Sequence, residues 1–429
     1  MDNLRAHGSA LVRFVERYVK VDLRYLASGA LWLTVGQFVA SLSALILAIA
    51  FARFVPKEMY GTYKYALSLI GILSIATLPG INAYLGQAIA RGAEGTLFTV
   101  LKDRIRWGLA GSVAGLLGAI YYISNGNTTL GAVLLIACLC IPFFETFGLF
   151  TVYLQAKKLF GQSIRYFTIV QLGSTAALLA VVYFIPSVIA LVAAYILSLL
   201  VLRLFFFLRT IRLYKPNDVS DAHALKYGTH LSIIGILGQA VTYVDTVFLF
   251  HFFGPTAVAL YSFAQAPIEQ IRSLFTKNLP SLALPKLAAR SMKEIDRMLV
   301  HRLSVLALLS VSICAVYFLA APYVFTILFP AYRDAVPISQ IIALLLVLYI
   351  PTSFLSSALQ SKLHLMPPYW IYWGALTDTL HIIVLFALLP YGIYAVIAGR
   401  AVEILSAFIL TLIQWKVLHD RERQRELIA

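Results

Sequence analysis

The sequence predicts an all-α polytopic membrane protein with twelve transmembrane helices, arranged as two parallel six-helix repeats (6+6) around a central cavity. Three observations support this prediction: an apolar composition, an uneven distribution of basic residues, and motifs that recur in the two halves. Of the 429 residues, 61% are hydrophobic and 12% are charged, whereas a soluble domain carries roughly a quarter charged residues. Lipid is therefore expected to surround most of the chain.

Apolar runs that are long enough to cross a bilayer define the expected helices. A spanning helix needs about 20 apolar residues, because the hydrocarbon core is roughly 30 Å thick. On this criterion the expected spans are residues 28–52, 63–89, 107–124, 130–154, 166–184, 188–208, 229–253, 257–281, 303–321, 335–359, 369–389 and 393–415.

The order of these spans predicts how the chain is divided. A basic, amphipathic segment at 1–27 is expected to lie on the cytoplasmic surface, because it lacks the apolar region of a signal peptide. Six-helix bundles are expected at 28–208 and 229–415. A cytoplasmic linker at 209–228 joins them, and a cytoplasmic tail follows at 416–429.

Lysine and arginine are concentrated on one predicted side of the membrane. Of the 34 such residues, 26 fall in the termini and in alternate loops, and four fall in the opposite loops. Loops rich in Lys and Arg remain in the cytoplasm, so both termini are expected there, with the protein in the cell (inner) membrane. The net charge of +15 is then explained by topology and by contacts with anionic membrane lipids, and no nucleic-acid partner is expected.

Two stretches in the first half of the chain recur in the second half. Gly36–Gln37 matches Gly238–Gln239, and the turn Phe54–Pro56 matches Phe253–Pro255. An offset of six spans gives both copies the same orientation, and transporters with parallel repeats hold substrate between the halves. Any two amphipathic membrane segments share some likeness, but the matches include loops as well as helices, which favours a true repeat.

The motifs of ATPases and metalloenzymes are missing from the sequence. It contains neither a G-x-x-x-x-G-K-[ST] run nor an H-E-x-x-H run, and its three cysteines lie in apolar runs. We therefore expect no catalytic residues, no cofactor and no metal site. The loops are too short to hold an active site, so function is expected between the helices, and energy from an H⁺ or Na⁺ gradient, the membrane potential or consumption of the product.

Charged residues inside membrane spans are candidates for functional sites, because hydrocarbon disfavours them. Gln265, Glu269 and Arg272 follow i, i+4, i+7 spacing on one face of the eighth span, and we expect them to line a substrate cavity. A purely structural Glu–Arg pair between helices is the alternative. Arg400 in the twelfth span is a further cavity candidate. It forms an i, i+3 pair with Glu403, which is equally compatible with a structural role.

A second group of polar residues is expected to serve ion coupling or gating. It consists of Asp245 in the seventh span, Asp378 and His381 on one face of the eleventh, and Glu403 in the twelfth. Histidine beside a carboxylate is suited to relay a proton. Packing of the histidine, and capping of a neighbouring helix by Asp245, are the structural alternatives. Glu145 in the fourth span is a weaker candidate of the same kind.

Three basic residues and one dipeptide have a simpler interpretation. Arg53 and Lys64, at the outer ends of the first two spans, are candidates for the substrate cavity, although snorkelling towards lipid headgroups explains them as well. Arg203 lies near the inner face and is expected to snorkel. Pro79 beside Gly80 is the best candidate for a hinge within a span.

Two motif regions resemble those of a known family. Residues 53–63 resemble the turn "A-R-x-L-G-P-E-x-x-G-x-Y", and residues 243–264, followed by Pro285, resemble "Y-x-D-x-x-x-(apolar)-G-P-x-x-V-x-x-Y-S-x-A". Both are typical of the Wzx-type flippases, the polysaccharide-transport branch of the multidrug/oligosaccharidyl-lipid/polysaccharide (MOP) exporter superfamily. The resemblance covers residues 28–415, with one departure, Val55–Pro56 in place of Gly-Pro.

The resemblance implies a flippase for a polyprenyl-pyrophosphate-linked oligosaccharide, made in the cytoplasm and used for surface polysaccharide biosynthesis. Glycosyltransferases and a glycan polymerase are the implied partners. One alternative is an ion-coupled multidrug antiporter of the same superfamily, which the nearly balanced deep charges leave open. A membrane glycan polymerase or ligase is less favoured, because such enzymes need a sizeable outer loop, and the longest one here is about Pro322–Asp334.

Overall fold

The structure is a computed structural model that describes residues 23–221, 228, 232, 233, 235–288, 290–362, 370 and 373–428. Every regular element within these residues is helical, which confirms the all-α prediction. The expected amphipathic segment at 1–27 lies outside them except for 23–27. Residues 222–227 of the expected linker also lie outside.

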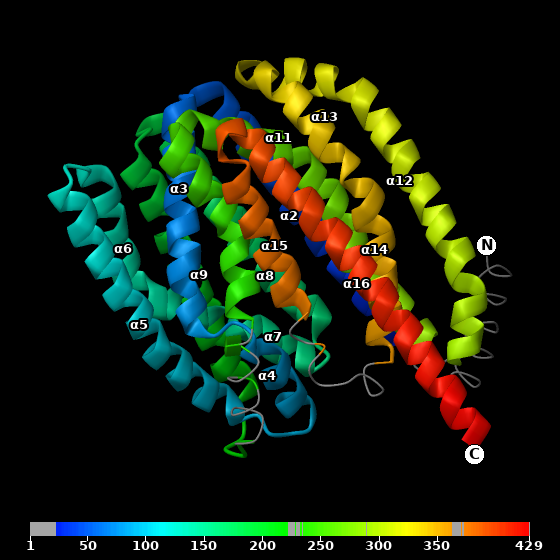
Figure 1. Ribbon diagram of the computed structural model, residues 1–429. Helices are drawn as coiled ribbons and strands as arrows, with labels where there is room; N and C mark the ends of the chain where they lie inside the picture. The colour runs from blue at the N-terminus through cyan, green and yellow to red at the C-terminus, as the bar shows by residue number, and fades with distance from the viewer. Residues whose placement is uncertain are drawn as a thin grey trace, which may run out of the picture. The chain divides into compact units, whose positions relative to one another are not determined.

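The first half of the described chain forms a series of helices that Figure 1 draws in blue to green. Two expected spans are each built from two helices, because the 3-10 turns Ile75–Thr77 and Thr146–Gly148 interrupt them. The helices are α2 (Leu23–Phe54), α3 (Lys57–Ser74), α4 (Ile81–Ala90), α5 (Thr96–Ser124), α6 (Thr128–Phe144), α7 (Leu149–Ala156), α8 (Phe160–Phe184) and α9 (Val188–Tyr214).

The second half continues in the same manner. Gly254 has φ 78° and ψ 179° and interrupts α11, at the turn expected between the seventh and eighth spans; this conformation is accessible essentially to glycine alone. The 3-10 turns Pro330–Ala335 and Leu389–Tyr391 precede α13 and α16. The helices are α11 (Ile236–Ala288), α12 (Met292–Leu328), α13 (Val336–Leu344), α14 (Leu346–Gln360), α15 (Trp373–Ala387) and α16 (Ile393–Ile428).

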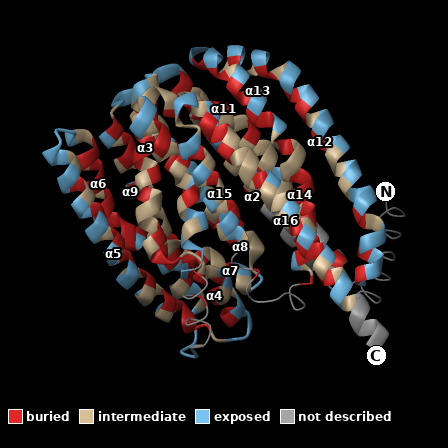
Figure 2. Ribbon diagram, in the orientation of Figure 1, coloured by how far each residue is buried: buried red, intermediate tan, exposed pale blue. Residues whose placement is uncertain are grey.

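Many of these helices are long and apolar enough to cross a membrane. Within the described residues, nine meet this test, or ten when the bent pair α3 and α4 is one span. Large apolar side chains such as Leu308, Val316 and Leu319 are exposed on α12, and Figure 2 shows exposed residues in pale blue along this helix. The chain is thus a multi-pass membrane protein. The number twelve stays a prediction, because α11 counts once and α15 has 15 residues.

The described helices gather into two compact units. Unit 1 contains the chain up to Leu47, Ala76–Ile185 and Ala193–Ser232, and unit 2 contains Ala48–Ile75, Pro186–Val192 and the chain from Ile233. The second span is therefore divided: α3 belongs to unit 2, and α4 belongs to unit 1. The domain boundaries expected from the sequence, by contrast, assign the whole span to the first bundle.

Within unit 2, α3 packs closely against α11 between Tyr243 and Pro255. A Cβ atom on Gly61 would collide with the carbonyl oxygen of Pro255, and one on Gly71 would collide with the ring of Tyr243. Between these points Tyr65 stacks on Phe250, with ring centroids 3.8 Å apart. Glycine lets two helices approach each other closely in a membrane, so this seam holds α11 in place beside the site described below.

Within unit 1, the segment after α9 is fastened to the loop between α4 and α5. The Gly95 amide donates to the carbonyl of Val219 at 2.9 Å, and the side chain of Asn217 accepts from the Glu94 amide at 3.1 Å. The Glu94 carboxylate in turn lies 2.5 Å from Nζ of Lys157 and accepts a hydrogen bond from the Tyr153 hydroxyl at 2.7 Å. The beginning of the linker is thus ordered against unit 1.

Candidate functional site

Unit 2 encloses a cavity of ≈ 220 Å³ between α11, α13, α14, α15 and α16. Both halves of α11 contribute to it, so the break at Gly254 brings two stretches of one helix to the same space. Its wall is rich in groups that hydrocarbon would reject. The polar lining residues are Thr242, Asp245, Thr246, Tyr261, Gln265, Glu269, Arg272, Tyr349, Asp378, Arg400 and Glu403.

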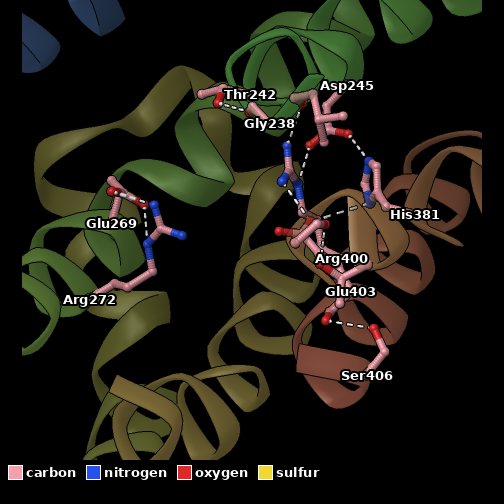
Figure 3. A network of polar contacts seen from close by, with 12 residues as sticks. Gly238, Thr242, Asp245, Glu269, Arg272, His381, Arg400, Glu403 and Ser406 are labelled. Atoms are coloured by element: carbon pink, nitrogen blue, oxygen red, sulfur yellow. Dashed lines mark hydrogen bonds and ion pairs between the residues drawn. The ribbon is translucent and has the colours of Figure 1, made fainter. Parts of the chain in front are cut away.

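Asp245 is the centre of a buried polar network, which Figure 3 shows. Its Oδ2 accepts a hydrogen bond from Nε of Arg400 at 2.6 Å and one from the hydroxyl of Tyr261 at 3.1 Å. Its Oδ1 lies 2.8 Å from Nε2 of His381. Only 3% of Asp245 is exposed. A buried carboxylate needs such partners to stay charged, so α15 and α16 are tied to α11 through this one group.

Arg400 of α16 is surrounded by oxygen atoms. Besides Asp245, its Nη1 donates to Oε2 of Glu403 at 2.8 Å, and its Nη2 donates to the carbonyl of Val241 at 3.1 Å. The planar guanidinium presents five donors in a rigid fork, which suits three acceptors in different directions. The predicted i, i+3 pair of Arg400 with Glu403 is therefore formed, and it belongs to a larger network.

His381 of α15 is fully buried and has two unlike ring nitrogens. Nε2 faces Asp245, whereas Nδ1 lies 3.6 Å from Oε2 of Glu403 and makes no hydrogen bond to any described residue. A neutral imidazole with its proton on Nε2 directs a bare lone pair towards this carboxylate.

Glu269 and Arg272 form a second pair on the other side of the cavity (Figure 3). Arg272 Nε lies 2.8 Å from one carboxylate oxygen of Glu269, and Nη2 lies 2.9 Å from the other. The guanidinium carbon also lies 5.0 Å from the ring centroid of Tyr349, a cation–π contact. Their side chains are 40% and 34% exposed, so this pair is open to a ligand.

Asp378 has no partner within the described part of the chain. It lines the cavity on α15, is half-buried, and makes no hydrogen bond or ion pair with a described residue. The cavity thus carries four carboxylates, those of Asp245, Glu269, Asp378 and Glu403, against two guanidinium groups. This excess of negative charge favours a proton or another cation at this place.

Two candidates from the sequence lie elsewhere in unit 2. Arg53 donates to the carbonyl of Ile327, at the end of α12, over 3.3 Å. Nζ of Lys64 lies 5.6 Å from the ring centroid of Tyr60. Neither side chain lines the cavity, and their contact with substrate stays a prediction.

Comparison with known proteins decides the family. Residues 26–277 match the family described as polysaccharide biosynthesis protein, and this match covers more than half of the chain. The chain belongs to the polysaccharide biosynthesis protein family. None of the curated proteins matches it in sequence.

Solved structures similar to this family member include transporters of the same superfamily. The lipid II flippase MurJ, in its inward closed conformation, is 13% identical over 89% of this chain and 87% of its own, with a TM-score of 0.71. The MATE multidrug transporter DinF-BH is 16% identical over 91% and 94% of the two chains, with a TM-score of 0.61. A MOP superfamily transporter from Pyrococcus furiosus is 15% identical over 92% of this chain and 96% of its own, with a TM-score of 0.59. At these identities the likeness shows the shared fold. Together with the family match, it confirms membership of the MOP superfamily.

Unit 1 of this family member contains a buried charged residue, Arg104, that the sequence did not indicate. Arg104 is 2% exposed, although it was expected in a cytoplasmic loop. The third span was expected to begin at residue 107, whereas α5 begins at Thr96. The helical spacing of apolar and small residues upstream was the missed signal. Leu97, Val100, Arg104, Gly108 and Gly111 are all buried on one face.

Arg203 of α9 does not snorkel as expected. Its Nη1 lies 3.0 Å from Oε1 of Glu145 and donates to the carbonyl of Phe144 at 2.8 Å. Glu145 is thus paired with this arginine. No group of three or more His, Cys, Asp and Glu side chains in the described ranges is arranged to hold a metal ion.

Proposed function

We propose that the chain is a flippase that moves a polyprenyl-pyrophosphate-linked oligosaccharide from the cytoplasmic to the outer leaflet by alternating access. The observation that carries this proposal is the charged cavity of unit 2, enclosed by apolar helices. The polysaccharide biosynthesis family supports a saccharide as cargo. The twelve spans in two six-helix repeats, with both termini on the cytoplasmic side of the inner membrane, are part of the proposal.

The physics of the substrate requires such a cavity. The lipid tail is stable in the bilayer, whereas each sugar and phosphate loses hydration in hydrocarbon. A flippase therefore shelters only the headgroup and leaves the tail in lipid. At ≈ 220 Å³ the cavity is below the roughly 300–1,000 Å³ of pockets for drug-sized ligands. It suits one sugar unit rather than a whole oligosaccharide.

Glu269, Arg272 and Gln265 are the proposed sugar contacts. They lie on one face of α11 and line the cavity with Tyr349. Carboxylate, guanidinium and amide groups together accept from and donate to sugar hydroxyls. The pair of Glu269 with Arg272 keeps both groups charged when the cavity is empty, and their exposure allows the exchange of one partner for another.

Asp245, Asp378, His381 and Glu403 are proposed to couple transport to an ion. Asp245 already has a cationic partner in Arg400. Asp378 makes no hydrogen bond or ion pair with a described residue, and Nδ1 of His381 faces Glu403 without a hydrogen bond. A proton can attach to either group without a coordination shell, whereas Na⁺ requires several oxygen ligands. These observations favour H⁺ over Na⁺.

The test is transport of the lipid-linked oligosaccharide by the purified protein in vesicles, and surface glycan in cells. Glu269→Gln and Arg272→Ala are each expected to reduce headgroup translocation and surface glycan without lowering the amount of protein in the membrane. Glu58→Gln, an exposed carboxylate outside the cavity, is the matched control. Full transport by both cavity variants would contradict the assignment of these residues.

One observation favours a second candidate, an ion-coupled multidrug antiporter of the same superfamily. Four carboxylates against two arginines would also attract an organic cation, and the similar structure of DinF-BH is that of a multidrug transporter. Export of organic cations without oligosaccharide translocation in the same vesicles would select this candidate. Glycosyltransferases and a glycan polymerase that supply and consume the glycan are the proposed partners of the flippase.

A further inference from the structure

The second span is broken at a defined point. α3 is followed by the 3-10 turn Ile75–Thr77, and Leu78 then adopts φ 56° before Pro79 and α4. The span bends by 48° across this break. Leucine in the left-handed region is strained, because its Cβ approaches the backbone. Such strain persists only where the surroundings hold it, so something must fix this break.

Arg104 of α5 contacts both the 3-10 turn of the break and the helix that follows it. Its Nε donates to the carbonyl of Thr77 at 3.0 Å, and its Nη2 to the hydroxyl of the same residue at 3.3 Å. Its Nη1 donates to Oδ1 of Asn82, in the first turn of α4, at 3.1 Å. One side chain thus links the last residue of the turn before the break to the helix that follows it.

A guanidinium is suited to this position. The broken helix leaves backbone carbonyls without an intrahelical partner, and a buried unpaired carbonyl is costly. The rigid fork of Arg104 supplies three donors in a fixed plane, which the single ammonium of lysine cannot do. No carboxylate in the described chain lies within ion-pair distance of it. Glu145 and Arg203 act on it from farther away.

The packing around the break is tight on the side of unit 1. A Cβ atom on Gly80 would lie 2.7 Å from the hydroxyl of Ser232, and one on Gly108 would lie 2.7 Å from Cα of Pro142. The boundary between the two compact units falls within the same break, after Ile75. α4 is therefore held with α5, whereas α3 is packed with α11.

We propose that residues 75–80 are a hinge of the second span and that Arg104 is the positioning residue that sets its angle. Arg104 holds Thr77 and Asn82 together in the bent form. When α3 turns relative to α4, the hydrogen bond to Asn82 breaks while those to Thr77 persist. The use of this motion for transport rests on the proposed function. The hinge itself can be measured without any substrate.

The test is a distance measurement across the break in the full chain, reconstituted in lipid nanodiscs. Spin labels at Glu58 and Gln87, which are exposed on α3 and α4, report the bend by pulsed electron resonance after the buried cysteines are replaced. Arg104→Ala is expected to broaden the distribution and to lengthen its mean by about 3 Å, from a rise of 1.5 Å per residue along straightened arms. Asn82→Ala is a milder variant that removes the hydrogen bond from Arg104 to α4. It should lengthen the mean distance between the labels by a smaller amount.

Arg203→Ala is the matched control, because Arg203 braces a different break, between α6 and α7. It is expected to lower the melting temperature and to leave the distance between α3 and α4 unchanged. An unchanged distribution in both Arg104→Ala and Asn82→Ala would overturn the hinge, as would an equal shift in Arg203→Ala. If wild-type vesicles translocate no lipid-linked saccharide while the Arg104 and Asn82 variants shift the distance, the proposed function fails and the hinge stands.

Discussion

Arg104 and Arg203 in unit 1 donate to backbone carbonyls where helices are broken, whereas Arg272 and Arg400 in unit 2 pair with carboxylates that line a cavity. In unit 1 Arg203 also pairs with one carboxylate, that of Glu145, which acts on Arg104 only from farther away. In unit 2 two arginines face four carboxylates. A carbonyl at a helix break has a fixed place, but a carboxylate on a side chain can change partners. The same residue type therefore braces one unit and supplies exchangeable charge in the other.

The largest expected effect concerns Asp245, which both ties α15 and α16 to α11 and belongs to the charged wall of the cavity. Asp245→Ala leaves the guanidinium of Arg400 and the imidazole of His381 buried beside an empty space. Removing one partner of a buried pair costs about 3–5 kcal/mol. We expect a corresponding loss of unfolding free energy in detergent and no transport. Asp245→Asn keeps one acceptor oxygen and should lose less stability; equal melting of Asp245→Ala and the wild type would refute the network.

Exchanging the positions of Glu269 and Arg272 tests whether this pair serves the stability of the protein or the transport of substrate. The double substitution E269R/R272E keeps an i, i+3 pair on a half-exposed face, so the unfolding free energy should change by less than about 1 kcal/mol. A misplaced charge-assisted hydrogen bond to substrate costs about 1.5–3 kcal/mol, so transport at low substrate concentration should fall about tenfold or more. Transport at the wild-type rate would show that this pair serves structure alone.

Acid is expected to weaken unit 1 at the loop between α4 and α5. Burial raises the pKa of Glu94, but hydrogen bonds from Lys157 and Tyr153 and the charge of Lys157 outweigh it, so its pKa lies below the usual value. A depressed pKa contributes stability that is fully present above the unfolded pKa of about 4.3. It is lost as the pH falls through the lower folded pKa.

The corresponding variant is Glu94→Gln. It should lower the unfolding free energy by about 1.5–3 kcal/mol at pH 7, the range for a charge-assisted hydrogen bond. Its deficit should disappear below the folded pKa. Melting curves of both proteins across this pH range provide the measurement. A deficit that stays constant with pH would contradict the role of the charge.

The smallest expected effect is at the exposed surface of unit 2. Lys57 and Asp334 form an ion pair of 3.2 Å, with side chains 30% and 78% exposed. Exposed pairs contribute about 0–1 kcal/mol. Lys57→Ala should therefore change the melting temperature little, and less still at high salt. A loss comparable to that of Asp245→Ala would mean that exposure does not distinguish the charged pairs of this unit.

The sequence predicted which residues share a face of one helix, but it did not predict which side chains from different helices meet. The spacing of Gln265, Glu269 and Arg272 placed them on one face, and the structure brings them to the same cavity. The network of Asp245 with His381 and Arg400 joins residues 136 and 155 positions apart. Periodicity along single helices does not show which helices meet, so these partners were not predictable.

Boundaries were the other source of error. Arg104 was assigned to a loop because charged residues at 102–106 interrupt the apolar run, although a helix continues through them. The hinge candidate Pro79–Gly80 coincides with the break in the second span. Proline favours such a break, since it lacks the amide donor, although Pro322 and Pro351 lie inside α12 and α14. The sequence contains no comparable mark for the side chain that braces the break.

The contacts of Asp245 also restrict the order in which related chains can change. A carboxylate left without its arginine can take up a proton and become neutral, whereas a guanidinium keeps its charge at any physiological pH. Loss of Arg400 first is thus a tolerable intermediate, and loss of Asp245 first is not. Among descendants of a common ancestor, an acid at position 245 should survive without arginine at position 400 far more often than the reverse.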